Sequence, residues 1–218
     1  MKISTFALIL GFVLATVTWT QVARAAGSDG TGFYVGGGAG VSRAKIDSAA
    51  INSSLLSIGA ATASTKKDEN SAAYKVFVGY AFNRYIAVEG GYFDLGKFNI
   101  DSTISPPGTL HGEIKPRGVN VDAVLSYPFA DGFSVFVRGG VQNTKTKATF
   151  SGSGSLVVTT PELSETKTSW KAGVGVGYEF SGGVGLRGEW ERYRVPDGSK
   201  SNEKSDVDVF GVSLYYKF

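Results

Sequence analysis

The sequence has no cysteine and only one histidine, and it has no second long hydrophobic run after the first twenty residues. Without cysteine, the chain can form no disulfide, no thiolate metal site and no lipid-anchored N-terminal cysteine. With a single histidine and no cysteine the chain lacks the ligands of a typical zinc site, and we expect no metal and no cofactor. The formal net charge is only +3 and no cluster of lysine and arginine stands out, so nucleic acid is not an expected partner.

The N-terminal hydrophobic run predicts export from the cytoplasm. Lys2 supplies the positive charge of a signal sequence, an apolar run follows, and residues 23–25 (Ala-Arg-Ala) fit a small-x-small cleavage site. The apolar run is shorter than the roughly 20 residues that a membrane-spanning helix needs. We therefore expect residues 1–25 to be a signal peptide and residues 26–218 to form one domain. An uncleaved membrane anchor is the alternative.

The remaining chain alternates apolar and polar residues with a period of two, which is typical of β-strands. The pattern is clearest at the C-terminus, where Phe210, Val212, Leu214, Tyr216 and Phe218 share one face. A bilayer offers no water to unpaired backbone groups. If this part of the chain enters a membrane without a spanning helix, it must therefore do so as a closed β-barrel.

The alternation recurs eight times and predicts an all-β fold, an eight-stranded antiparallel up-and-down transmembrane β-barrel. The expected strands are 32–43, 71–82, 85–97, 114–127, 133–147, 166–180, 183–195 and 205–218. Tight turns alternate with longer segments rich in Ser, Thr, Gly and charge. We expect these longer segments, 44–70, 98–113, 148–165 and 196–204, to be loops outside the cell, with the tight turns and both termini in the periplasm.

The composition of the two strand faces indicates which face meets lipid. The polar face mixes glycine with charges of both signs in near balance, which suits a narrow lumen where an unpartnered charge is very costly. The apolar face carries Tyr, Trp and Phe near strand ends, as aromatic girdles do. The alternative is a soluble barrel with the faces reversed, whose charges form a solvated surface.

Three blocks of the sequence resemble the eight-stranded transmembrane domain of OmpA-like outer-membrane proteins. They are residues 78–92 (VGYAFNRYIAVEGGY), the segments 118–128 and 137–140, and the segments 177–180, 186–190 and 211–218. The resemblance implies a bacterial outer-membrane protein whose neighbours are outer-membrane lipid and lipopolysaccharide. The chain stops at the barrel pattern, so we expect no peptidoglycan-binding domain. Such proteins usually end in an aromatic residue that the outer-membrane assembly machinery recognises, and Phe218 fits; alternatively it is simply a lipid-facing residue.

The resemblance also implies a network of ion pairs that plugs the lumen and could gate ion passage. Val124 departs from the family pattern, which has a lysine there, so Lys171 or Lys75 would have to supply the missing cation. The expected members on the polar face are Lys75, Glu89, Asp122, Arg138, Lys171, Glu179, Arg187 and Glu189.

Three other features could suggest chemistry. The glycine runs 36–40 and 173–177 lack the following helix that a phosphate-binding loop needs. His111 could act as a base, but the sequence spacing places no serine beside it. Glu189 and Glu191 could suggest glycosidase chemistry, although lumen ion pairs explain them better. We therefore expect no enzyme.

These observations favour a structural, surface-exposed barrel whose loops could contact host or environmental ligands. The main alternative is a narrow, low-conductance pore or small-solute channel, although side chains just fill an eight-stranded barrel. A lipid-active enzyme using His111 is a weaker alternative. Loop 44–70 reads as flexible and solvent-exposed, and adhesion and simple solubilisation explain it equally well.

Overall fold

The computed structural model describes residues 30–44, 62–105, 108–154, 162–196 and 204–218. The expected signal peptide lies outside these ranges. Across them, no helix has the length and hydropathy needed to cross a membrane.

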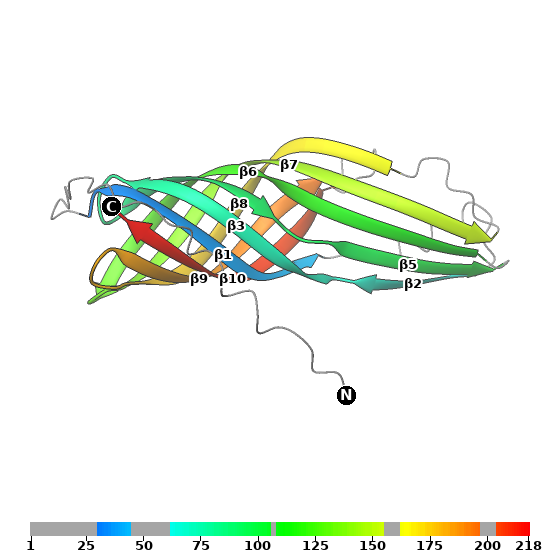
Figure 1. Ribbon diagram of the computed structural model, residues 1–218, viewed down its shortest axis with the longest axis horizontal. Helices are drawn as coiled ribbons and strands as arrows, with labels where there is room; N and C mark the ends of the chain where they lie inside the picture. Colours follow the sequence, from blue (N-terminus) through cyan, green and yellow to red (C-terminus); the bar gives the residue numbers. More distant parts are fainter. Residues whose placement is uncertain (1–29, 45–61, 106–107, 155–161, 197–203) are drawn as a thin grey trace, which may run out of the picture.

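Ten strands within the described ranges form one antiparallel sheet, and eight of these strands close into a barrel (Figure 1). Around the barrel the order is β6-β4-β3-β1-β10-β9-β8-β7, and β7 pairs with β6 to complete the circle. The predicted eight-stranded antiparallel barrel is therefore confirmed. The strands are β1 (Gly32–Ala44), β2 (Thr62–Asp68), β3 (Asn70–Ala81), β4 (Ile86–Asp94), β5 (Phe98–Ser105), β6 (Gly108–Ala130), β7 (Phe133–Gly154), β8 (Glu162–Glu179), β9 (Val184–Pro196) and β10 (Lys204–Lys217).

The sheet continues beyond the barrel at one end, where loops were predicted. Segment 98–113 is wrong as a loop, because β5 and the start of β6 form a paired hairpin. β2 lies within predicted loop 44–70 and pairs with β5, while β7 and β8 run into predicted loop 148–165. These segments were predicted as loops because they are rich in threonine and serine. These residues are common in loops, but here they pair across strands, as in Thr109–Ser153, whose hydroxyl oxygens lie 2.6 Å apart.

Tight turns gather at the opposite end of the barrel, which we call the short-turn end; the end with the sheet extension is the long-loop end. Asn83 shapes one turn, since its Oδ1 accepts hydrogen bonds from the backbone N–H groups of Tyr85 and Ile86. Gly132 occupies another turn with a φ of 76°. The last residue of the chain also lies at this end (Figure 1).

The expected orientation of the two strand faces is confirmed. Val121 points outward and is 56% exposed, whereas Val124, three residues on along the same strand, points inward and is 1% exposed. Outward aromatic rings lie at both ends of the apolar band. The ring centroids of Phe33 and Tyr80 are 4.7 Å apart at the short-turn end, and Trp170 lies toward the long-loop end. An exterior of this kind matches the lipid-facing band and aromatic girdles of outer-membrane barrels.

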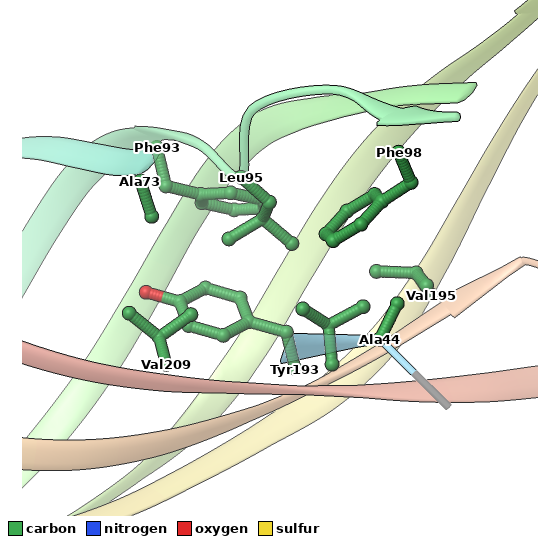
Figure 2. Close-up of a cluster of buried hydrophobic side chains, with 9 residues drawn as sticks. Ala44, Ala73, Phe93, Leu95, Phe98, Tyr193, Val195 and Val209 are labelled. Carbon is green, nitrogen blue, oxygen red and sulfur yellow. The ribbon is translucent and has the colours of Figure 1, made fainter. Parts of the chain in front are cut away.

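Two apolar clusters fill the interior at different levels. The short-turn cluster contains Tyr34, Phe77, Ala81, Ala87, Val124, Phe136 and Tyr215. The long-loop cluster contains Ala44, Ala73, Phe93, Leu95, Phe98, Tyr193, Val195, Val207 and Val209. Figure 2 shows Phe93 and Leu95 of this second cluster facing Tyr193 across the interior. The charged residues of the polar face lie between these two clusters.

Two adjacent glycines of β7 test how tightly the wall is packed. A Cβ on Gly140 would lie 2.1 Å from the carbonyl oxygen of Val121 on the neighbouring strand, whereas a Cβ on Gly139 would meet nothing within 4 Å. We expect Gly140→Ala to lower the free energy of unfolding by about 1–3 kcal/mol, because backbone must move to make room. The matched control Gly139→Ala should leave the free energy of unfolding, measured by urea titration, unchanged or raise it slightly. Equal effects of the two substitutions would contradict this packing.

Candidate functional site

The candidate site is a layer of buried charge in the middle of the barrel. The pleat of six strands turns these side chains inward, and the antiparallel register brings them to the same level; for example, Glu89 of β4 is opposite Asp122 of β6. Gly173 and Gly175 of β8 lie opposite Glu191 and Glu189. Because glycine has no side chain, β8 leaves room in the lumen for these two long carboxylate side chains. The charged layer consists of Lys75, Glu89, Asp122, Arg138, Lys171, Arg187, Glu189 and Glu191.

Arg138 lies at the centre of this layer and contacts all four of its carboxylates. Its Nη1 is 2.9 Å from Glu89 Oε2, 3.6 Å from Asp122 Oδ2 and 3.3 Å from Glu191 Oε1. Its Nη2 is 3.1 Å from Glu189 Oε2. A guanidinium with its several donors suits this bridging position better than a lysine ammonium would.

Two lysines complete the long-loop side of the layer. Lys75 Nζ lies 2.6 Å from Glu189 and 2.9 Å from Glu191. Lys171 Nζ lies 2.8 Å from both Asp122 and Glu191. Glu191 thus contacts three cations, and each carboxylate of the layer has at least two.

Arg187 extends the layer toward the short-turn cluster. Its Nη1 donates a hydrogen bond to Glu89 Oε1 at 2.5 Å. The same guanidinium lies 4.4–5.8 Å from the ring centroids of four aromatic residues, which offer it cation–π contacts. These rings belong to Tyr34, Phe77, Phe136 and Tyr215.

Neutral hydroxyl groups donate to three of the carboxylates, at oxygen atoms that cations of the layer also contact. Tyr34 Oη donates to Glu89 at 2.7 Å and Tyr193 Oη donates to Glu191 at 3.0 Å. Ser213 Oγ donates to Glu189 at 2.5 Å. The four cations and four carboxylates cancel in formal charge, as a buried set of ions requires.

The structure brings together seven of the eight predicted network residues and leaves out Glu179. Glu179 is exposed at the short-turn end, where it accepts a hydrogen bond from Tyr215 Oη at 3.3 Å. Glu191 also belongs to the layer; it was expected, with Glu189, to form lumen ion pairs, although it was not one of the eight network residues named from the sequence. At the position without the family lysine, Val124 belongs to the short-turn cluster, and Lys171 and Arg138 contact Asp122 instead.

Little free volume remains in the charged layer. A cavity of about 20 Å³ borders Lys75, Glu189, Glu191 and Tyr193, which is room for about one water molecule. Apolar clusters close the interior on both sides of the layer. Filled at three levels, the described interior has the packing expected of an eight-stranded barrel.

His111 lies on the outer face of the sheet extension and is not in the charged layer. Its Nδ1 is 2.6 Å from Asp101 Oδ1, and Ser151 is its register partner on β7. Strand pairing thus places a serine opposite His111, which the spacing along the chain did not indicate. His111 and Asp101 are both more than half exposed on an open sheet. A hydrolase instead needs an enclosed, oriented base and oxyanion donors.

One charged group of the extension has a shifted pKa. A hydrogen bond and ion pair with Lys115 lower the pKa of Glu113 below its usual value, and Lys97 lies 3.9 Å away on the other side. Glu113 therefore remains ionised in mildly acidic surroundings and continues to neutralise Lys115.

An eight-stranded barrel with an apolar exterior, two aromatic girdles and a charge-filled interior defines an integral β-barrel protein of the bacterial outer membrane. The sequence model of the family described as "outer membrane protein beta-barrel domain" matches residues 12–218, and the chain belongs to this family. It is an OmpA-like protein of the bacterial outer membrane.

The relatives agree with this assignment. Outer membrane protein A of Serratia marcescens is 27% identical over 212 residues, which cover 96% of this chain and 55% of the relative. The chain thus spans about half the length of this relative. Among solved structures, Ail of Yersinia pestis is similar with a TM-score of 0.53 and 19% identity, over 87% of this chain and 99% of Ail. Neisserial surface protein A is similar with a TM-score of 0.55 and 13% identity, over 85% of this chain and 97% of the neisserial protein.

Proposed function

We propose that this protein is a closed structural barrel of the outer membrane, with no path for solutes through its interior. The observation that carries the proposal is the three-level filling of the lumen, in which the charged layer lies between two apolar clusters. Water or ions would have to displace both a charge-balanced set of buried ions and packed aromatic rings. A narrow, low-conductance pore is the competing function.

Planar-bilayer recording of the purified barrel tests this proposal. We expect no steady openings, because the remaining cavity beside the charged layer holds about one water molecule. Steady openings that Arg187→Ala or Glu179→Ala abolishes would instead establish a pore through the barrel. The recordings need a folded-protein check by heat-modifiable gel migration, so that a silent bilayer does not simply reflect unfolded protein.

We propose that the sheet extension at the long-loop end is the surface that meets the cell's surroundings, including a host or environmental ligand. Its outer face is polar and carries Asp101, His111 and Ser151. No enzymatic role is proposed for these residues, since they lie exposed on an open sheet. Outer-membrane lipid and lipopolysaccharide are the proposed neighbours of the apolar band.

Phe218 is proposed to serve as a signal for the outer-membrane assembly machinery. Its side chain is 58% exposed at the end of β10 and lies 5.2 Å from the ring of Tyr216. We expect Phe218→Ala to reduce the folded protein in cellular outer membranes several-fold while leaving refolding in detergent unchanged. Phe33→Ala, which removes an outward ring at the same end, is the matched control. Equal losses in cells from both substitutions would show that Phe218 is simply a lipid-facing residue.

A further inference from the structure

Two cations face each other on the outer surface of the barrel wall, at its long-loop end. Arg117 of β6 and Lys145 of β7 are register partners, and both are exposed. Like charges directly opposite each other on one face of a sheet are destabilising. A second cationic pair, Lys115 and Lys147, lies two residues farther from the membrane on the same strands.

The pair lies at the outer boundary of the apolar band. On β6, the outward row of Tyr127, Leu125, Val121 and Val119 ends at Arg117. With a rise of about 3.3 Å per residue and a strand tilt of about 40°, the step from Tyr127 to Arg117 spans about 25 Å of height. That height matches the apolar band of an outer-membrane barrel. Arg117 and Lys145 therefore lie where the headgroups of the outer leaflet begin.

The two cationic pairs differ in the ion pairs that they form within the described ranges. Farther out, Lys115 is ion-paired with Glu113, and Lys147 lies 3.6 Å from Glu162.

By contrast, no ion pair joins Arg117 or Lys145 to any residue of the described ranges. Asp94 is the register partner of Arg117 on β4 and lies beside it, but the two form no ion pair; Asp94 Oδ1 accepts a hydrogen bond from the backbone N–H of Gly96. Elsewhere on the outer wall, Arg192 is neutralised by a two-point contact with Asp208.

We propose that Arg117 and Lys145 bind a phosphate group of an outer-leaflet lipid, the phosphorylated headgroup of lipopolysaccharide. The planar guanidinium can bind two phosphate oxygens while the ammonium adds a compact charge, and the bound anion removes the repulsion between the two cations. The apolar row directly below them fits acyl chains of the same lipid. This inference rests on the proposed role as a structural, lipid-embedded barrel and identifies the lipid group that the wall contacts.

The test compares binding of lipid A with two phosphates and chemically dephosphorylated lipid A to the refolded full chain in detergent micelles. We expect the wild type to bind the phosphorylated lipid more tightly than the dephosphorylated one. The double variant Arg117→Gln/Lys145→Gln should bind the phosphorylated lipid about 30-fold more weakly than the wild type, which is about a factor of five per cation. The matched control Lys115→Gln/Lys147→Gln removes the same number of charges from the same strands, one row farther out, and should change affinity less than threefold.

Two results would overturn the assignment. Equal losses in the two double variants would mean that overall charge, not this pair, attracts the lipid. Equal affinity for soluble inorganic phosphate would mean that the site takes a free anion and not a membrane headgroup. Heat-modifiable gel migration confirms that each variant is folded. Bilayer conductance tests the closed barrel separately, since a conducting barrel could still show the phosphate preference.

Discussion

Replacing Arg138 with methionine is expected to lower the free energy of unfolding by about 3–5 kcal/mol, among the largest effects of any single substitution in this barrel. Arg138 lies within 3.6 Å of four carboxylates, and methionine would fill much of its volume without its charge. The remaining three cations of the layer would then face four buried carboxylates. One negative charge would be uncompensated in an interior that closes out water.

Urea titration of the protein refolded into lipid vesicles, read by heat-modifiable gel migration, measures this loss. Arg192→Met is the matched control, since Arg192 also contacts a carboxylate but lies partly exposed on the outer wall. An exposed ion pair of that kind contributes about 0–1 kcal/mol. If Arg138→Met and wild type unfold at the same urea concentration, the ion pairs described for the charged layer are wrong.

The size of this loss does not mean that the charged layer is a strong net source of stability. Bringing ions out of water costs several kcal/mol each, and well-packed apolar residues can replace a whole buried ion set with little loss. The layer does require that all its members be present together. The short-turn cluster, which includes Val124, shows that apolar packing fills part of the lumen.

The barrel could be predicted from the sequence because one physical rule governs every strand. Lipid outside and a narrow lumen inside force alternation, as seen in the outward Val121 and inward Asp122. The alternation fixes which face each residue occupies. It also limits a shift in register, since a one-residue slip would turn every inward-pointing charge of a strand toward lipid.

The sheet extension could not be predicted because that rule no longer applies beyond the membrane. Water meets the outer face of β5 and of the start of β6, and serine and threonine at such positions are equally compatible with loops. What makes these segments strands is pairing with a neighbour, such as the contact between the hydroxyl oxygens of Thr65 and Ser102 at 2.8 Å. Such pairing depends on the approach of segments far apart in sequence.

For the charged layer, the alternation along each strand identified which face of the strand a residue occupies, but not its height along the barrel axis. Glu179 and Glu191 both point to the polar side of their strands, yet only Glu191 reaches Arg138. Height in the barrel depends on strand tilt and stagger, which the pattern within one strand does not contain. The level of a residue is therefore known only when the register of all eight strands is known.

Substitutions of Glu89 and Glu179 make this distinction measurable. Glu89 contacts Arg138 and is the ion-pair partner of Arg187 among the described residues, so Glu89→Gln leaves the Arg187 guanidinium buried among aromatic rings alone. We expect a loss of about 3–5 kcal/mol in the free energy of unfolding. Glu179→Gln, the matched control, should change it by less than about 0.5 kcal/mol, because Glu179 is exposed.

A double substitution distinguishes the loss of the Glu89–Arg187 ion pair from any other damage caused by the glutamine. In Glu89→Gln/Arg187→Met the unpartnered cation is gone, so the double variant should unfold at a higher urea concentration than Glu89→Gln alone. Arg187 contacts Glu89 at 2.5 Å, which is close enough for the two substitutions to be strongly coupled. Strictly additive losses, or a loss from Glu179→Gln as large as that from Glu89→Gln, would show that the charged layer is not centred on Glu89 and Arg138.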